Sequence, residues 1–239
     1  EVVIAVVGTM KAGKSTTINA IVGTEVLPNR NAPMSTLPTL IRNVHGQTEP
    51  VLKLEKLQPL EDLSKQIATK LAVLIKSNKI EKLKLYDEKD GKELIDNLLK
   101  NKCYQFKKEY HSQKSICEFL TRLNDLMRLA KDPLINVEPP YDEYQNVDEL
   151  PVIEVEFHHL KDKSNLGRGS LAILDTPGAN EAGQSDALKK VFEKQLEKAS
   201  IVVLVTDFNQ IGSENPLLYW LFLIIPNLSQ MQINRFAMK

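Results

Sequence analysis

Residues 1–20 read EVVIAVVGTMKAGKSTTINA, and this stretch decides the fold. Residues 1–7 are mostly apolar and β-branched, which is typical of a strand covered on both faces in a parallel sheet. Residues 8–15 fit the pattern GxxxxGK[ST] at every defined position. Residues 15–22 indicate a helix that Gly23 can end. A phosphate-binding loop requires a strand before it and a helix after it, and the sequence predicts both.

The residue types in this loop suit the phosphates of a nucleotide. Glycines let backbone N–H groups surround phosphate oxygens, and the helix N-terminus adds its dipole. We expect Lys14 to bridge the β- and γ-phosphates and the Ser15 hydroxyl to hold Mg²⁺. A chance glycine turn is the alternative. The candidate nucleotide-binding residues of the loop are Gly8, Thr9, Met10, Lys11, Ala12, Gly13, Lys14, Ser15 and Thr16.

A second motif, LAILDTPG, occupies residues 171–178. Its apolar half predicts a buried strand, and ligands of an open α/β sheet bind at the carboxyl ends of the strands. We expect Asp175 to hold Mg²⁺ through water and the Gly178 N–H to sense a γ-phosphate. An ordinary turn is the alternative for this motif taken alone.

The remaining pattern predicts an α/β fold with a mostly parallel sheet flanked by helices. Apolar runs at 39–44, 51–54, 152–157, 171–174 and 201–205 predict strands, and 186–198 an amphipathic helix. Between about 55 and 140, leucines and isoleucines recur at helical spacing, which predicts a helical insertion. His158 and His159 are expected to end a strand and point to opposite faces, which would exclude a shared metal site.

Composition excludes several classes of protein. With 42% hydrophobic and 26% charged residues the chain is too apolar for disorder. The 31 basic and 31 acidic residues balance, so nothing marks a nucleic-acid-coating domain. Cys103 and Cys117 form no CxxC motif, which favours a reduced, cytoplasmic compartment. The apolar run at 217–225 is far short of the roughly 20 residues of a membrane-spanning helix.

Residues 5–20, together with PMSTLPT at 33–39, resemble the bacterial dynamin-like GTPases. The resemblance runs from residue 1 to about 210 and includes LNDL at 123–126 and residues 175–184. It implies a dynamin-like G domain of the P-loop GTPase class, with GTP as substrate and Mg²⁺ as cofactor. It also implies self-association through the G domain and a link to replication-fork or nucleoid organisation in the bacterial cytoplasm. Contact with a replication clamp or a membrane would use segments outside these residues.

The resemblance implies three further site residues. The family's loop after the first helix carries a hydroxyl that completes the Mg²⁺ shell. The Pro-x-Thr pattern gives that position to Ser35, with Thr36 as the alternative one residue on. Lys11 stands where related proteins carry a cation or a polar residue, and it could act as a catalytic finger supplied in cis. A lysine that simply faces solvent is the alternative. The candidate catalytic residues are therefore Lys11, Lys14, Ser35 and Thr36, and the candidate metal ligands are Ser15, Ser35 and Asp175.

The sequence departs from the family near its end. Guanine is read by an [NT]KxD motif, which the 239 residues lack, and residues 69–72 read TKLA instead. Residues 216–239 form an apolar tail that departs from the family pattern, with a divergent buried strand or helix as the alternative. We therefore expect residues 1–215 to be an incomplete G domain, truncated at its C-terminus and part of a longer protein. The alternative function is a non-catalytic homologue that binds nucleotide weakly or acts as a protein-interaction module.

One charged region remains open to two interpretations. Residues 76–114 hold eleven Lys against seven Asp or Glu. This surplus could face DNA or lipid, but interspersed charges of both signs are typical of a solvated helix face.

Overall fold

The computed structural model of the chain describes residues 1–9, 12–28, 37–146, 149–160, 170–177 and 186–206. The predicted strand and helix on either side of the glycine loop are both present, as β1 (Val2–Gly8) and α1 (Lys14–Val22). Ala5 and Val6 in β1 have no exposed surface, and neither has Ile18 in α1. The β-branched run therefore lies inside the sheet, with α1 covering it.

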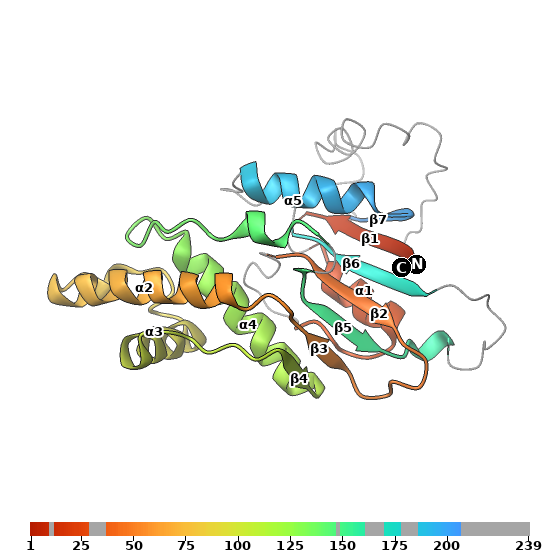
Figure 1. The fold of residues 1–239 in the computed structure, drawn as a ribbon, viewed down its shortest axis with the longest axis horizontal. Helices are drawn as coiled ribbons and strands as arrows, with labels where there is room; N and C mark the ends of the chain where they lie inside the picture. Colours follow the sequence, from red (N-terminus) through yellow and green to blue (C-terminus); the bar gives the residue numbers. More distant parts are fainter. Residues whose placement is uncertain (10–11, 29–36, 147–148, 161–169, 178–185, 207–239) are drawn as a thin grey trace.

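In the described part of the chain the sheet has seven strands in the order β4-β3-β5-β2-β6-β1-β7 (Figure 1). The predicted α/β class is confirmed. The pairing differs from the expected mostly parallel sheet: β1–β6, β1–β7 and β2–β5 are parallel, whereas β2–β6, β3–β4 and β3–β5 are antiparallel. The other strands are β2 (Thr39–Asn43), β3 (Val51–Lys53), β4 (Glu109–His111), β5 (Val152–Val155), β6 (Leu171–Asp175) and β7 (Ile201–Val205).

The reversal of β2 matters for the site. Because β2 runs antiparallel to β6, its first residue, Thr39, lies directly opposite Asp175, the last residue of β6. The parallel pairing of β1 with β6 sets Val6 beside Asp175 as well. The start of β2 and the ends of β1 and β6 therefore meet at one edge of the sheet.

Three helices lie together at the β3–β4 end of the sheet (Figure 1). They are α2 (Gln58–Lys76), α3 (Lys89–Asn101) and α4 (Gln113–Ala130), and a 3-10 turn, η1 (Ile80–Lys82), lies between the first two. Their apolar stripes are buried against one another, as in Leu60, Leu63, Ile67 and Leu71 of α2. Helix α5 (Asp186–Glu197) lies alongside β7 and β1 (Figure 1).

Two local expectations need correction. The helical region also contributes β4, whose three residues are too few for a period to reveal and which pairs with β3. His158 and His159 do not end a strand. They begin the 3-10 turn η4 (His158–Leu160), and their ring centroids are 5.6 Å apart. The further 3-10 turn η2 (Tyr141–Tyr144) precedes β5.

Candidate functional site

The phosphate loop leaves β1 at Gly8, where the backbone of a neighbouring strand comes very close. A Cβ atom at Gly8 would lie 2.2 Å from the carbonyl oxygen of Val205 in β7. Only a residue without a side chain fits between two strands at this distance. The first glycine of the motif is therefore required by strand packing.

The second glycine of the motif is required by backbone conformation. Gly13 precedes α1 with φ 92° and ψ 18°, in the left-handed region, and nothing lies within 4 Å of a Cβ built there. Its carbonyl accepts from the Thr17 N–H at 2.9 Å, which starts the helical pattern. The backbone N–H groups of the first turn of α1 thus face the loop, as an anion site requires.

Lys14 is held inside the loop. Its side chain is 8% exposed, and Nζ donates to the carbonyl oxygens of Gly8 at 3.2 Å and Thr9 at 3.0 Å. The Thr9 carbonyl also accepts from the Ala12 N–H at 3.3 Å, which folds the loop back on itself. A buried ammonium group bound to carbonyl oxygens in a glycine loop is suited to attract phosphate oxygens.

The second motif places its acidic residue at the same edge. Asp175 is 5% exposed at the end of β6. Thr176 follows it with no exposed surface, and its hydroxyl donates to the Val6 carbonyl oxygen at 2.7 Å. This hydrogen bond ties the chain after β6 to β1, so the position of Asp175 is fixed relative to the phosphate loop.

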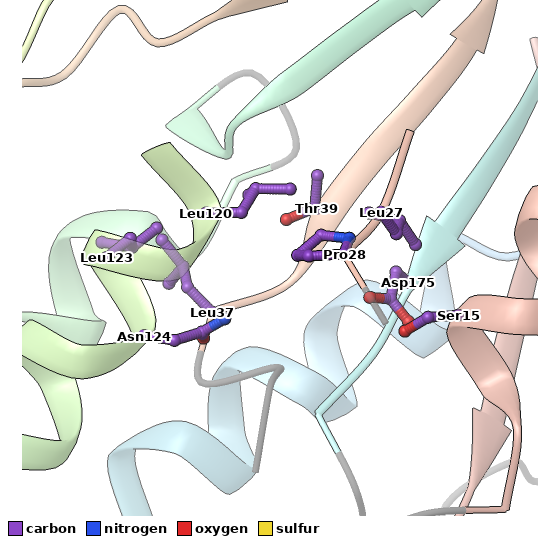
Figure 2. A pocket seen from close by; sticks show the side chains of 9 residues that line it. All are labelled: Ser15, Leu27, Pro28, Leu37, Thr39, Leu120, Leu123, Asn124 and Asp175. Atoms are coloured by element: carbon purple, nitrogen blue, oxygen red, sulfur yellow. The ribbon is translucent and has the colours of Figure 1, made fainter. Parts of the chain in front are cut away.

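Ser15 and Asp175 line one small pocket and point toward each other (Figure 2). The pocket has a cavity volume of about 20 Å³, which is room for about one water molecule. A hydroxyl and a carboxylate are the oxygen ligands that Mg²⁺ takes in proteins, usually with several waters retained. These residues therefore fit the predicted metal site. The pocket is lined by Ser15, Leu27, Pro28, Leu37, Thr39, Leu120, Leu123, Asn124 and Asp175.

Two polar residues of this pocket were not among the predicted site residues. Thr39 is 4% exposed and enters through the antiparallel register of β2 and β6. Asn124 is 6% exposed and enters from α4, far away in the sequence. Two signals in the sequence pointed to Asn124: it is a polar residue inside the apolar stripe of Leu120, Leu123 and Met127, and it lies in the LNDL stretch of the family resemblance.

Asn19 of the phosphate-loop helix shapes the pocket indirectly. Its Oδ1 accepts from the N–H groups of Val26 and Leu27, both at 3.0 Å, and its Nδ2 donates to the Leu27 carbonyl oxygen at 2.9 Å. Leu27 and Pro28 line the pocket. Asn19 therefore fixes the segment that leads from α1 toward residues 29–36.

Several predicted site residues lie outside the described part of the chain. They are Met10, Lys11, Ser35, Thr36 and Gly178. Of the other predicted residues, the described structure brings Gly8, Thr9, Ala12, Gly13, Lys14, Ser15 and Asp175 to one edge of the sheet, while the side chain of Thr16 is exposed in the first turn of α1.

The described residues contain neither a further candidate metal cluster nor a candidate membrane span. No group of three or more His, Cys, Asp or Glu that could hold a metal ion occurs there. No helix among these residues is both long and apolar enough to cross a membrane.

Comparison with known proteins identifies relatives of this chain. The family model described as "Dynamin family" matches residues 4–221. Two curated relatives, both named "Clamp-binding protein CrfC" and both from Escherichia coli, one of them strain K12, are each 46% identical over 213 residues. The match covers 89% of this chain and 28% of each relative, so this chain spans little more than a quarter of their length.

Two solved structures also match. Both come from work titled as describing an oligomerised bacterial dynamin pair in the long-range sensing and tethering of membranes. Each is 17% identical and covers 92% of this chain. The matches take in 25% and 24% of those chains, with TM-scores of 0.42 and 0.40.

Proposed function

This chain belongs to the dynamin family, and we propose that it binds GTP with Mg²⁺ and hydrolyses it to GDP and phosphate. The observation that carries the proposal is the meeting of the two sequence motifs. Ser15 of the phosphate loop and Asp175 of the second motif line one pocket and point toward each other (Figure 2). Buried Lys14 lies in the same loop, so a cation, a hydroxyl and a carboxylate are available where a nucleotide's phosphates would bind.

The described residues would act on the phosphates by charge and orientation. Lys14 would move its ammonium hydrogen bonds from the Gly8 and Thr9 carbonyls to phosphate oxygens, where charge-assisted bonds are stronger. Ser15 would bind Mg²⁺ directly and Asp175 through water. When bound, Mg²⁺ would neutralise phosphate charge. Water would attack the γ-phosphorus as the bond to the β–γ bridging oxygen breaks.

The residues outside the described part keep the roles expected from the second motif and from the resemblance. In this proposal Ser35, or Thr36 one residue on, supplies a further hydroxyl to Mg²⁺. Gly178 contacts the γ-phosphate through its N–H, and Lys11 stabilises the charge that develops between the β- and γ-phosphates. Residues 1–215 serve as the nucleotide-binding domain.

The choice of guanine is the part of the proposal that the motifs support least. The family relation supports GTP, but the 239 residues contain no [NT]KxD motif to read the base. The second candidate function is a non-catalytic protein that binds nucleotide weakly or serves as an interaction module. The two candidates differ in nucleotide affinity and in turnover.

A titration with fluorescent GTP and ATP analogues, in excess Mg²⁺ and in EDTA, tests the proposal. We expect micromolar binding of GTP, weaker binding of ATP, and release of phosphate from GTP. Lys14→Ala should weaken binding at least tenfold, because each charge-assisted hydrogen bond contributes about 1.5–3 kcal/mol. The matched control is Lys70→Ala, since Lys70 is an exposed lysine on α2.

The possible results separate the two candidate functions. GTP binding that Lys14→Ala removes and Lys70→Ala keeps, with phosphate release, supports the GTPase. Binding without turnover supports the non-catalytic protein. Equal affinity for GTP and ATP, or none for either at millimolar concentration, contradicts the GTPase.

We also infer four properties from the relatives and the resemblance. The chain would self-associate through its nucleotide domain in the bacterial cytoplasm. The longer protein would contact a replication clamp, as the name of the E. coli relatives suggests, or a membrane, and so take part in replication-fork or nucleoid organisation. Sedimentation with and without a non-hydrolysable GTP analogue tests self-association, and a binding assay between the full-length protein and purified clamp tests the partner.

A further inference from the structure

One face of α4 forms a wall of the pocket that contains Ser15 and Asp175. Leu120, Leu123 and Asn124 line the pocket, at the i, i+3 and i+4 spacing that places side chains on one face of a helix. The helical region between β3 and β5 therefore reaches the phosphate site itself. In Figure 2 these three residues stand across the pocket from Ser15 and Asp175.

Asn124 differs from its neighbours on that face by being polar. Leu120 and Leu123 are 5% and 2% exposed, and Asn124 is 6% exposed. Taking an amide out of water costs free energy unless it makes hydrogen bonds, so a carboxamide in this stripe is a group that binds polar partners. Its carbonyl oxygen accepts, and its NH₂ group offers two donors.

The pocket brings Asn124 together with the three other polar residues that line it. Ser15 comes from α1, Thr39 from β2 and Asp175 from β6. The open centre has room for about one water molecule. A carboxamide at the wall of a water-sized space beside two candidate oxygen ligands suits a group that orients metal-bound water.

Ion pairs hold α4 in place on the next turns. Arg128 contacts Glu88 through two hydrogen bonds, at 2.6 and 3.0 Å, and Asp125 at 3.2 Å. Arg122 pairs with Glu93 at 2.6 Å. Since Glu88 directly precedes α3 and Glu93 lies within it, the contacts of Arg128 with Glu88 and of Arg122 with Glu93 join α4 to α3. Asn124 therefore stands on a rigid element, which a positioning residue requires.

We propose that Asn124 is a positioning residue of the nucleotide site, which orients the water shell of Mg²⁺ beside Ser15 and Asp175. This inference rests on the proposed function. It gives the helical region between β3 and β5 a direct part in nucleotide binding. Asn124 should therefore affect nucleotide affinity only when Mg²⁺ is present, because it acts on water that the metal holds.

The test measures how strongly Mg²⁺ improves nucleotide affinity. The dissociation constant of a fluorescent GTP analogue is determined in EDTA and in excess Mg²⁺, and their ratio is compared between variants. Asn124→Ala should lower this ratio about tenfold or more, as is typical when a group supporting a metal shell is lost. Asn124→Asp should raise this ratio. Its added negative charge repels the nucleotide's phosphates in EDTA and attracts Mg²⁺ when the metal is present.

The opposite directions separate positioning from a merely structural role, which would weaken binding equally with and without Mg²⁺. Asn101→Ala, at the exposed end of α3, is the matched control and should leave the ratio unchanged. If the ratio of dissociation constants in Asn124→Ala equals that of the wild type, the inference about Asn124 is wrong and the proposed function stands. If the wild-type protein binds no GTP, both the inference and the proposed function are wrong. If circular dichroism shows that Asn124→Ala is unfolded, the isosteric Asn124→Asp decides, and a ratio at or below wild type overturns the inference.

Discussion

The two glycines of the phosphate loop are constrained for different physical reasons, and substitutions should separate them. Gly8→Ala pushes a methyl group toward a backbone oxygen 2.2 Å away, so we expect a loss of about 3 kcal/mol or more in the free energy of unfolding. Gly13→Ala meets no atom but keeps a left-handed φ, which costs about 1–2 kcal/mol. Urea denaturation followed by circular dichroism measures both.

Gly46 supplies the matched control for Gly13. It has φ 79° and nothing within 4 Å of a Cβ, yet it lies outside the phosphate loop. Gly46→Ala should therefore cost the same stability as Gly13→Ala, but only Gly13→Ala should weaken nucleotide binding. Equal stability losses for Gly8→Ala and Gly13→Ala would contradict this explanation.

Lys11 gives a prediction about turnover. If Lys11 stabilises charge between the β- and γ-phosphates, Lys11→Ala should lower the turnover of GTP by about 100-fold while GTP affinity changes little. Phosphate release at saturating GTP measures this, with Lys70→Ala as control. Full turnover in Lys11→Ala would show that this lysine only faces solvent.

At the scale of elements, Asn19 joins α1 to the segment that follows it. The side chain makes three hydrogen bonds to Val26 and Leu27. Each contributes about 1 kcal/mol net, and alanine's higher helix propensity returns part of the loss. Asn19→Ala should therefore lower the free energy of unfolding by about 2 kcal/mol in urea denaturation.

The control for Asn19 is an asparagine with little to lose. Asn101 is exposed and bonds only Asn97 among the hydrogen bonds seen in the described residues. Asn101→Ala should change stability by less than about 0.5 kcal/mol. A similar small effect for Asn19→Ala would mean that the segment 26–28 is held by its apolar contacts instead.

The elements also show what sequence could and could not predict. The phosphate loop was predictable because its motif, strand and helix are consecutive, and Asp175 because its apolar run marks a strand end. Thr39 was not, since it reaches the site only through an antiparallel register between distant strands. Asn124 was not predictable either, because it reaches the pocket only through the packing of α4 against the rest of the fold. The three-residue β4 carried too short a pattern.

At the scale of the whole molecule, one ion cluster joins distant segments and should make stability depend on pH. Lys56, after β3, contacts Glu143 at 2.7 Å and Glu149 at 3.4 Å. The pKa of Glu149 is lowered from its usual 4.5, first by the Asn146 N–H that donates to its carboxylate and then by Lys56.

A carboxyl group with a lowered pKa in the folded state stabilises fully above its usual pKa, and the contribution is lost as the pH falls through the lowered value. Wild-type stability should therefore fall more steeply below pH 4.5 than that of Glu149→Gln. Urea denaturation at pH 7, 4.5 and 3.5 measures the difference. At pH 7 it should be under about 1 kcal/mol, because the Glu149 side chain is 28% exposed. Parallel pH curves would contradict this assignment.

The place of β1 in the sheet has a consequence for synthesis on the ribosome. Val2 pairs with Leu171, and Ile4 pairs with Ile201, so both strands that flank β1 are made long after it. At about 5–20 residues per second, roughly 10–30 s pass between the synthesis of β1 and that of β6, the first of its partner strands. During that time an apolar, β-branched segment has no sheet to join. Nascent chains should therefore depend on chaperones that bind such apolar segments until β6 has been synthesised.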